Sequence, residues 1–362
     1  MKLIKNELTS KERLKLYSQG KEVDRIPVTL TASETIPLLY GIDICDYYFS
    51  ADHMYNVETM LANDFDADNM GMGLGLRTLV EALGTKLQYP KNNVSSIMEP
   101  ALKDYSNLDN MPLVNIEKDG RFPILIEAFS RLIDTFGDTK IISTGMAGPL
   151  TTAIGLIGTE KFLKDSIKDK ANVHKLLEYS SQCIIKCAHD LNRKLGINVS
   201  LSEPMVARNI LSLKQFKELE KPYLTKIVSE FKKFQSAPGI HVCGTTKDRW
   251  LDLVETGISS LSIDNCENMK ELKLLFGDKI AISGNVDPVN TLRYGTFFDI
   301  EAEVKKCLLN TADNPNGFTL SPGCTVPIMT PKENIIAFMN AASIYGKHAQ
   351  KGILPRGIEI VI

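Results

Sequence analysis

A histidine and a cysteine stand two positions apart in the segment GIHVCGTTKDRW, residues 239–250. The apolar residues that lead into them are typical of a buried strand, and residues two apart on a strand face the same side. His241 and Cys243 therefore present one nitrogen and one sulfur to the same place, and zinc takes both ligand types in proteins. Free cysteine is also among the most buried residue types. The pair thus indicates either half of a zinc site or two core side chains.

Cys324, in the segment SPGCTVP, is the candidate third ligand. Three protein ligands and one open position are typical of a catalytic zinc site. Gly244 and Gly323 stand beside the two cysteines and allow the backbone to turn sharply there. Cys183 and Cys187 are one helical turn apart, which favours a place in the core. Three further cysteines have no histidine near them and are also expected to serve packing: Cys45, Cys266 and Cys307.

Short apolar runs alternate with amphipathic helical stretches along the chain, a pattern that predicts parallel βαβ units. Eight such units without a linker predict a (β/α)8 barrel, with a doubly wound open sheet as the alternative. We expect a single (β/α)8 barrel domain over residues 1–362, with an N-terminal helical extension. The segment GMGLGL, residues 71–76, lacks the third glycine of a dinucleotide-binding turn and is interpreted as a loop. The expected strands are 26–30, 66–70, 140–144, 198–202, 239–243, 260–264, 280–284 and 317–321.

In a barrel of this kind, functional residues lie where the strands end. Glu203 and Asp264 end two expected strands and are candidate catalytic residues, either as hydrogen-bond partners of His241 or as a fourth zinc ligand. Met146 and Asn285 are candidates for contact with a cofactor. For each of them a structural role, as a cap, a turn residue or core packing, is the alternative. The full set of residues at expected strand ends is Thr31, Asp68, Met146, Glu203, His241, Cys243, Asp264, Asn285 and Cys324.

The composition excludes several classes of protein. The formal net charge is −2, which argues against nucleic-acid binding through a basic surface. There is no apolar run of membrane-spanning length, and the chain starts with a charged helix rather than a signal peptide. We therefore expect a cytoplasmic protein without a membrane partner. In such a chain the seven cysteines do not predict a disulfide framework.

Four segments resemble the uroporphyrinogen decarboxylase superfamily, and together they extend over nearly the whole chain. The similar segments are SKERLKLYSQGKEVDRIPV (10–28), GPLTTAIGLIGTEKFLKDSIKDKANVHKLLE (148–178), GNVDPVNTL (284–292) and GCTVPIMTPKENIIAFMNAA (323–342). The resemblance implies a distorted (β/α)8 barrel. It also implies one of two chemistries: porphyrinogen decarboxylation, or cobamide-dependent methyl transfer of the methylcobamide:coenzyme M type.

His241, Cys243 and Cys324 match the zinc motif of the methyltransferase branch, in which HxC is followed far downstream by a cysteine. Charge gives a second, independent discrimination. Residues 26–76 contain no arginine or lysine, although a pocket for a polycarboxylate needs cations. The same stretch contains eight acids, namely Glu34, Asp43, Asp46, Asp52, Glu58, Asp64, Asp66 and Asp68. A decarboxylase is therefore disfavoured.

The resulting hypothesis is a zinc-dependent transfer of a methyl group from a methylcobamide, carried on a corrinoid protein, to a small thiol such as coenzyme M. Zinc supplies the activation, because a free thiol is mostly protonated at neutral pH and a coordinated one is not. The alternatives are tetrahydrofolate as methyl acceptor, a decarboxylase-like enzyme, and a corrinoid or zinc carrier without catalytic activity.

Overall fold

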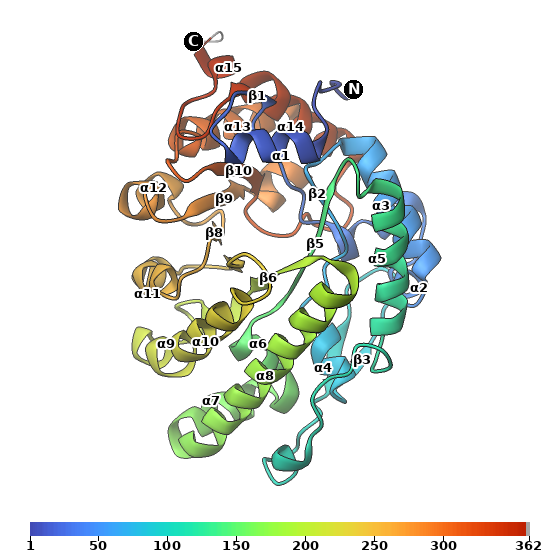
Figure 1. Cartoon of the computed structure of the whole chain (residues 1–362), viewed down its shortest axis with the longest axis vertical. Coiled ribbons are helices and arrows are strands. Elements are labelled where there is room, and N and C mark those ends of the chain that lie inside the picture. The colour runs from blue at the N-terminus through green and yellow to red at the C-terminus, as the bar shows by residue number, and fades with distance from the viewer. Residues whose placement is uncertain (360–362) are drawn as a thin grey trace.

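Seven parallel strands curl into the sheet at the centre of the fold (Figure 1). The computed structural model describes residues 1–359. Neighbouring strands follow the order β10-β9-β8-β7-β6-β5-β2, so each strand from β5 to β10 pairs with the next along the chain. This is the order of a (β/α)8 barrel, and the expected fold class is confirmed. The strands are β2 (Asn69–Met70), β5 (Ile141–Ala147), β6 (Asn198–Ser202), β7 (Gly239–Val242), β8 (Ser260–Ile263), β9 (Ala281–Val286) and β10 (Phe318–Pro322).

Residues 26–30 close the barrel without forming the regular strand that was expected. The preceding strand β1 (Val23–Arg25) pairs antiparallel with β11 (Lys347–Ala349), outside the barrel. Val28 then forms a parallel bridge with Leu320 of β10, and its carbonyl accepts a hydrogen bond of 2.7 Å from the Asp68 N–H, next to β2. The segment thus joins the two edges of the sheet. Pro27 has no N–H to donate, which interrupts a regular ladder here.

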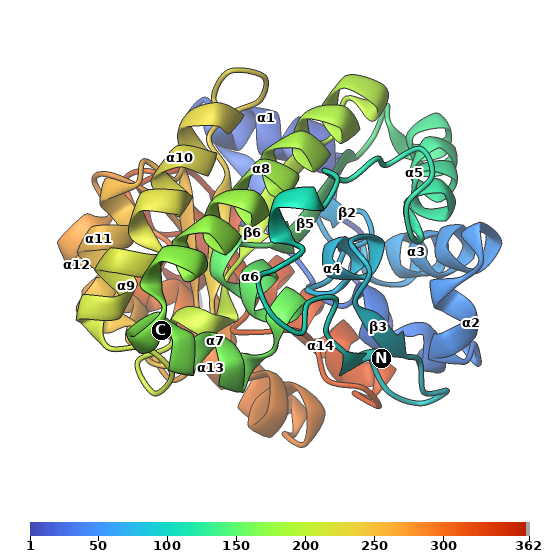
Figure 2. The same ribbon diagram turned by 90° about the horizontal axis from the view of Figure 1, so that it is seen from below.

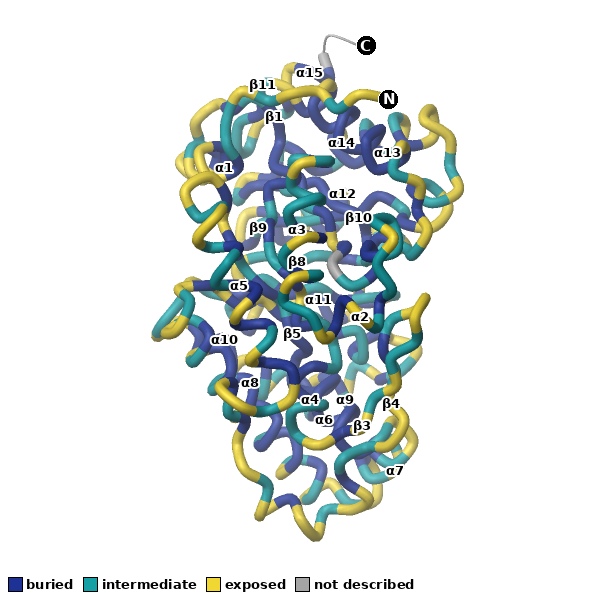
Figure 3. The backbone as a smooth tube through the Cα atoms, turned by 90° about the vertical axis from the view of Figure 1, so that its right-hand side faces the viewer, coloured by how far each residue is buried: buried dark blue, intermediate teal, exposed yellow. Residues whose placement is uncertain are grey.

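Helices surround the sheet (Figures 1 and 2), and the buried residues of the strands and helices form one apolar layer between them (Figure 3). Besides the central sheet and the β1–β11 pair, the described part of the chain has one further sheet, a hairpin of β3 (Lys86–Gln88) and β4 (Ser96–Glu99). The helices are α1 (Ser10–Ser18), α2 (Ile44–Tyr48), α3 (Ala51–Phe65), α4 (Thr78–Ala82), α5 (Phe122–Phe136), α6 (Pro149–Ile157), α7 (Thr159–Lys168), α8 (Lys170–Leu195), α9 (Leu213–Leu219), α10 (Lys221–Phe231), α11 (Trp250–Glu255), α12 (Met269–Phe276), α13 (Phe297–Thr311), α14 (Lys332–Tyr345) and α15 (Arg356–Glu359).

A buried ion cluster anchors α1 to the start of the barrel. The Asp68 carboxylate accepts hydrogen bonds of 2.5 Å from Arg13 and from Arg25, and all three side chains are fully buried. The Val28 N–H donates to the same carboxylate at 2.8 Å. Asp68 was expected at the end of a strand, but it lies before β2 and has a structural role.

The acidic stretch at 26–76 is largely neutralised by cations from other parts of the chain. Ion pairs join four further acids to basic residues outside the stretch: Asp43–Lys91, Asp52–Arg131, Asp66–Lys140 and Asp64–Lys332. Most of the eight acids are therefore engaged in ion pairs within the fold. The number of acids in the stretch is not evidence of a negatively charged pocket. The absence of arginine and lysine from this stretch remains the informative part of the charge pattern.

Two buried carboxylic acids lie in the helix layer beside α6. The backbone N–H of Thr151, in the first turn of α6, donates to Glu203 Oε1 at 2.9 Å, and the Thr151 hydroxyl donates to the same oxygen. Glu220 precedes α10 and, like Glu203, has no exposed surface. Within residues 1–359, Glu203 Oε2 and both oxygens of Glu220 have no hydrogen-bond partner. Burial raises the pKa of Glu203 to about 8, and burial together with the charge of Glu203 raises the pKa of Glu220 well above its ordinary value.

Replacing Asp68 with asparagine should lower the free energy of unfolding by about 3–5 kcal/mol, because two buried guanidinium groups lose their shared counter-charge. Urea denaturation followed by circular dichroism measures this change. Asp52→Asn, which breaks an exposed ion pair with Arg131, is the matched control and should leave the stability nearly unchanged. An Asp68→Asn variant as stable as the wild type would mean that this cluster does not anchor the first strand.

Replacing Glu220 with glutamine should stabilise the chain more at pH 9 than at pH 4. A carboxyl group whose folded pKa is raised favours folding at low pH, and that contribution is lost as the pH rises from 4.5, the ordinary value, to about 8 for Glu203. The variant escapes the cost of ionising a second buried acid, so its stability relative to the wild type should increase as the pH rises. Unfolding midpoints of wild type and variant across this pH range provide the test, and a pH-independent difference would contradict it.

Candidate metal centre

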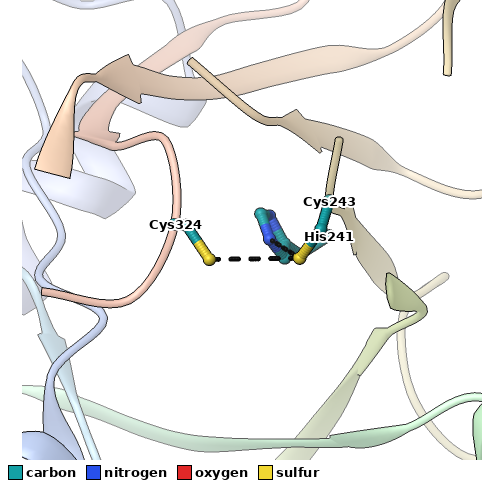
Figure 4. Close-up of side chains that lie close together, drawn as sticks. All are labelled: His241, Cys243 and Cys324. Carbon is teal, nitrogen blue, oxygen red and sulfur yellow. Dashed lines mark hydrogen bonds between the residues drawn. The ribbon is translucent and has the colours of Figure 1, made fainter. Parts of the chain in front are cut away.

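His241 and Cys243 come from the end of β7 and point to the same place, as their spacing predicts (Figure 4). The Nε2 atom of His241 lies 3.2 Å from Cys243 Sγ. Cys243 follows the last residue of the strand, and the next residue, Gly244, has a φ of +66°. This left-handed conformation is strained for other residues, so glycine allows the chain to turn away directly after the ligand.

Cys324 reaches the same place from the loop after β10. Its Sγ atom lies 3.9 Å from Cys243 Sγ (Figure 4). The preceding residue, Gly323, passes so close to Asn265 that an added Cβ atom would lie 2.6 Å from the Asn265 backbone nitrogen. A larger residue at 323 would push the loop, and Cys324 with it, away from β7.

The three ligand atoms already have the spacing of a tetrahedral zinc site. All lie within 4.8 Å of one another, and each residue is partly accessible to solvent. Zn–S bonds of about 2.3 Å and Zn–N bonds of about 2.0 Å place two sulfurs about 3.8 Å apart and a nitrogen and a sulfur about 3.5 Å apart. The distances of 3.9 and 3.2 Å fit this geometry. Among the described residues no fourth histidine, cysteine or carboxylate joins the group, so a metal held by these three residues would keep a position for a ligand from solution.

The two cysteines are also prepared electrostatically for a cation. Hydrogen bonding with Cys243 and His241 lowers the pKa of the Cys324 thiol to about 4. The hydrogen bond with Cys324, followed by burial, raises the pKa of Cys243 instead. The pair therefore loses its first proton easily and its second with difficulty, because two thiolates at this distance repel each other. A divalent cation between the sulfurs removes that repulsion and stabilises both thiolates.

Ser262 is a part of the site that the sequence interpretation missed. Its hydroxyl lies 3.0 Å from His241 Nδ1, on the neighbouring strand β8 and in register with the histidine. A partner at Nδ1 leaves Nε2 directed at the sulfurs, with its lone pair available to a metal. The sequence contained a pattern that could have indicated this role. Ser262 and Asp264 are two residues apart at the end of their strand, as His241 and Cys243 are on the preceding strand.

Asp264 and Asn285 lie beside the ligands but are engaged with the backbone. The Gly244 N–H donates to Asp264 Oδ2 at 2.9 Å, and the Cys266 N–H donates to Oδ1 at 3.2 Å. The Asn285 side-chain amide donates to the carbonyls of Asp264 and Glu267, each at 3.0 Å. Asp264 thus fixes the turn after Cys243, and Asn285 fixes the loop that carries Asp264. Both are positioning residues in this geometry.

Glu203 and Met146 face away from the ligands. Ser202 of β6 is in register with His241, so the alternation of side chains turns Glu203, the next residue, toward α6. In the same way Ala147 is in register with Ser202, which turns the buried Met146 toward the helices. The structure therefore does not bring these two candidate residues to the centre. Glu203 contacts His241 only through its backbone N–H, which donates to the His241 carbonyl at 2.8 Å.

The remaining cysteines are separate from the site or lie at its edge. Cys183, Cys187 and Cys307 are buried, as expected, whereas Cys266 is exposed, contrary to the expectation of packing. Cys45 lies in a small acidic cluster with Asp43, which is partly accessible, and Asp46, which is exposed. No helix within residues 1–359 has both the length and the apolar character needed to cross a membrane.

Comparison with known proteins places this geometry in a family. The family model for uroporphyrinogen decarboxylase (URO-D) matches residues 9–345. A methylcobamide:CoM methyltransferase of Methanosarcina barkeri (strain Fusaro / DSM 804) is 26% identical over 346 residues, which cover 94% of this chain and 99% of the relative. A uroporphyrinogen decarboxylase of Pseudoalteromonas atlantica is 24% identical over 302 residues, covering 80% of this chain and 81% of that protein.

The structure of a methyltransferase from Methanosarcina mazei superposes with a TM-score of 0.82 and 26% sequence identity, covering 93% of this chain and 98% of that chain. Both the family match and this superposition extend over nearly all of the barrel. The chain belongs to the uroporphyrinogen decarboxylase (URO-D) family.

Proposed function

We propose that this chain is a zinc-dependent methyltransferase that moves a methyl group from a methylated corrinoid to a small thiol. The observation that carries the proposal is the convergence of His241, Cys243 and Cys324, whose ligand atoms lie within 4.8 Å of one another. The similarity to methylcobamide:CoM methyltransferases supports the corrinoid as methyl donor and a thiol of the coenzyme M type as acceptor. A corrinoid protein is the partner expected to deliver the methyl group.

In the overall reaction the thiol loses its proton, its sulfur forms a bond to the methyl carbon, and the cobalt–carbon bond breaks with its electron pair left on cobalt. When bound, zinc lowers the pKa of a coordinated thiol, so that the acceptor is a thiolate at neutral pH. His241, Cys243 and Cys324 would hold the metal. Ser262 orients the imidazole through Nδ1, and Asp264 holds the turn after Cys243 through the Gly244 N–H.

The open position sits at the carboxyl ends of β7 and β10, the end of a barrel at which enzymes of this fold bind substrate. The three ligands are partly accessible there, so a thiol can reach the free position from solution. A carrier of zinc or corrinoid without catalytic activity has no need for an open position.

Decarboxylation of a porphyrinogen remains the less favoured activity. The first arginine or lysine after residue 26 is Arg77. Of the acids in that stretch, Glu58 is buried and one of its oxygens has no partner within the described chain. Burial raises the pKa of Glu58 to about 7. The stretch itself supplies no cation for the carboxylates of a porphyrinogen, and the four basic residues that reach it from elsewhere are paired with its own acids. Tetrahydrofolate as acceptor is disfavoured because its nitrogen gains nothing from a site prepared for sulfur.

Replacing Cys324 or His241 with alanine should abolish tight zinc binding, because two ligands rarely hold zinc. We expect about one zinc per wild-type chain, and a loss of thiol-dependent methylcobalamin demethylation of about 100-fold or more in each variant. Elemental analysis measures the metal, the visible spectrum of methylcobalamin measures the transfer, and circular dichroism verifies the fold. Cys45→Ala, which removes a cysteine on α2, is the control and should behave as wild type.

Full zinc in Cys324→Ala would remove this cysteine from the site. Demethylation that persists in a zinc-free variant would contradict the proposed activation of the thiol. Formation of coproporphyrinogen from uroporphyrinogen by the wild type would favour the decarboxylase alternative.

A further inference from the structure

The inward-facing residues of the barrel are small at the level of His241. Strand register places five of them in one layer with the histidine, because each pairs with a neighbour in that layer. These residues are Ala147, Ser202, Ser262, Ser283 and Thr319. The interior of a (β/α)8 barrel is ordinarily filled by layers of bulky branched side chains. Apart from the imidazole, this layer contains nothing larger than threonine.

The layer below is smaller still. Two residues earlier on the same strands, alternation places five further residues on the inward face. They are Gly145, Ser200, Gly239, Ser260 and Ala281. None is larger than serine, so side chains from opposite walls do not meet in the middle as they do in a packed barrel core.

Solvent accessibility follows the same alternation. On β6, Val199 and Leu201 face the helices and are 1% and 2% exposed, whereas Ser200 between them is an exposed residue. Gly145, Gly239 and Ser260 are likewise partly accessible although each has buried neighbours in its strand. Toward the start of the strands the inward face continues with Ser143, partly accessible, and Asn198, which is exposed. Small accessible hydroxyl-bearing walls provide the partners that ordered water needs.

Hydroxyl groups link this interior to the metal ligands. His241 Nδ1 is 3.0 Å from Ser262 Oγ, and Ser262 is in register with Ser283 on the next strand. Ser283 Oγ is 3.1 Å from Ser321 Oγ. Each hydroxyl both donates and accepts, and neighbouring strands about 4.8 Å apart leave a distance that one water can bridge.

We propose that the barrel interior is a hydrated, serine-lined channel that leads from the start of the strands to the metal centre and carries away the proton that the acceptor thiol loses. The second half of this statement rests on the proposed function. The three metal ligands lie at the carboxyl end of the barrel, where a methylated corrinoid would have to approach them, so the accessible interior would offer the proton a way out through the opposite end. Ser262, in contact with His241, is the first hydroxyl of that route, and Ser260 and Ser200 lie one layer nearer the start of the strands.

Cysteine labelling tests the channel without any reference to methyl transfer. In Ser200→Cys, a small cationic methanethiosulfonate should modify residue 200 at least about tenfold faster than the native buried Cys187, because thiol reactivity follows access. Val199→Cys is the matched variant on the other face of the same strand and should react as slowly as Cys187. Peptide mass spectrometry assigns the label to each residue. Equal, slow labelling at 199 and 200 would overturn the channel.

Blocking the channel tests its use. Ser200→Leu should bind zinc as the wild type does. With saturating methylcobalamin and added coenzyme M, the variant should release the thiol proton at least about tenfold more slowly, because a leucine excludes water from the barrel interior. A pH indicator in stopped flow measures proton release. Ser18→Leu, at the exposed end of α1, is the control for a surface leucine.

Proton release by Ser200→Leu at the wild-type rate would overturn the proton route. A wild type that binds no zinc and releases no proton would defeat the proposed function instead, and the labelling contrast between residues 199 and 200 would still decide whether the channel exists.

Discussion

The convergence of three ligand atoms depends on closure of the barrel. Cys243 and Cys324 follow β7 and β10, which are separated by two other strands, and their sulfurs are nevertheless 3.9 Å apart. Only a sheet that curls onto itself brings such strand ends across one opening. Closure in turn depends on residues 26–30, which are hydrogen-bonded to both edges of the sheet. It also depends on Asp68, whose carboxylate accepts hydrogen bonds from the Val28 N–H and from two buried arginines. The metal centre is therefore tied to an ion cluster in another part of the fold.

The two faces of the barrel wall have opposite chemical character. Outward residues such as Leu201 and Ile240 are apolar and buried against the helices, and they hold the fold together. The layers beneath His241 are small and hydroxyl-bearing, and they stabilise little by packing. A barrel of this design takes its stability from the helix layer, so its interior is free to serve chemistry. Glu203 and Glu220, buried on the helix side, carry a cost in stability that is unrelated to the ligands.

The elements of the fold were readable from alternating periodicity. Ligand type and spacing, together with the family resemblance, predicted that His241, Cys243 and Cys324 converge, and their ligand atoms lie within 4.8 Å of one another. The errors concern the direction of side chains. Glu203 and Met146 lie at strand ends as expected but face the helices, because the register between strands, rather than position along a strand, decides which residues face the axis. Residues 26–30 resemble a strand in composition, yet Pro27 and side-chain hydrogen bonds from Asn69 give them an irregular path. Ser262 could have been found by asking which residues of the next strand face the same side as His241. The ion pairs of the acidic stretch could not, since their partners come from distant segments.

In the proposed centre the metal has two cysteine sulfurs and one histidine nitrogen as protein ligands, and a thiol fills the remaining position. Zinc-edge X-ray absorption of the zinc-loaded protein, recorded with and without coenzyme M, measures the number of sulfur ligands. Two sulfurs without the thiol and three with it, at about 2.3 Å, is the predicted result. A sulfur count that stays at two when the thiol is present in excess would contradict the account.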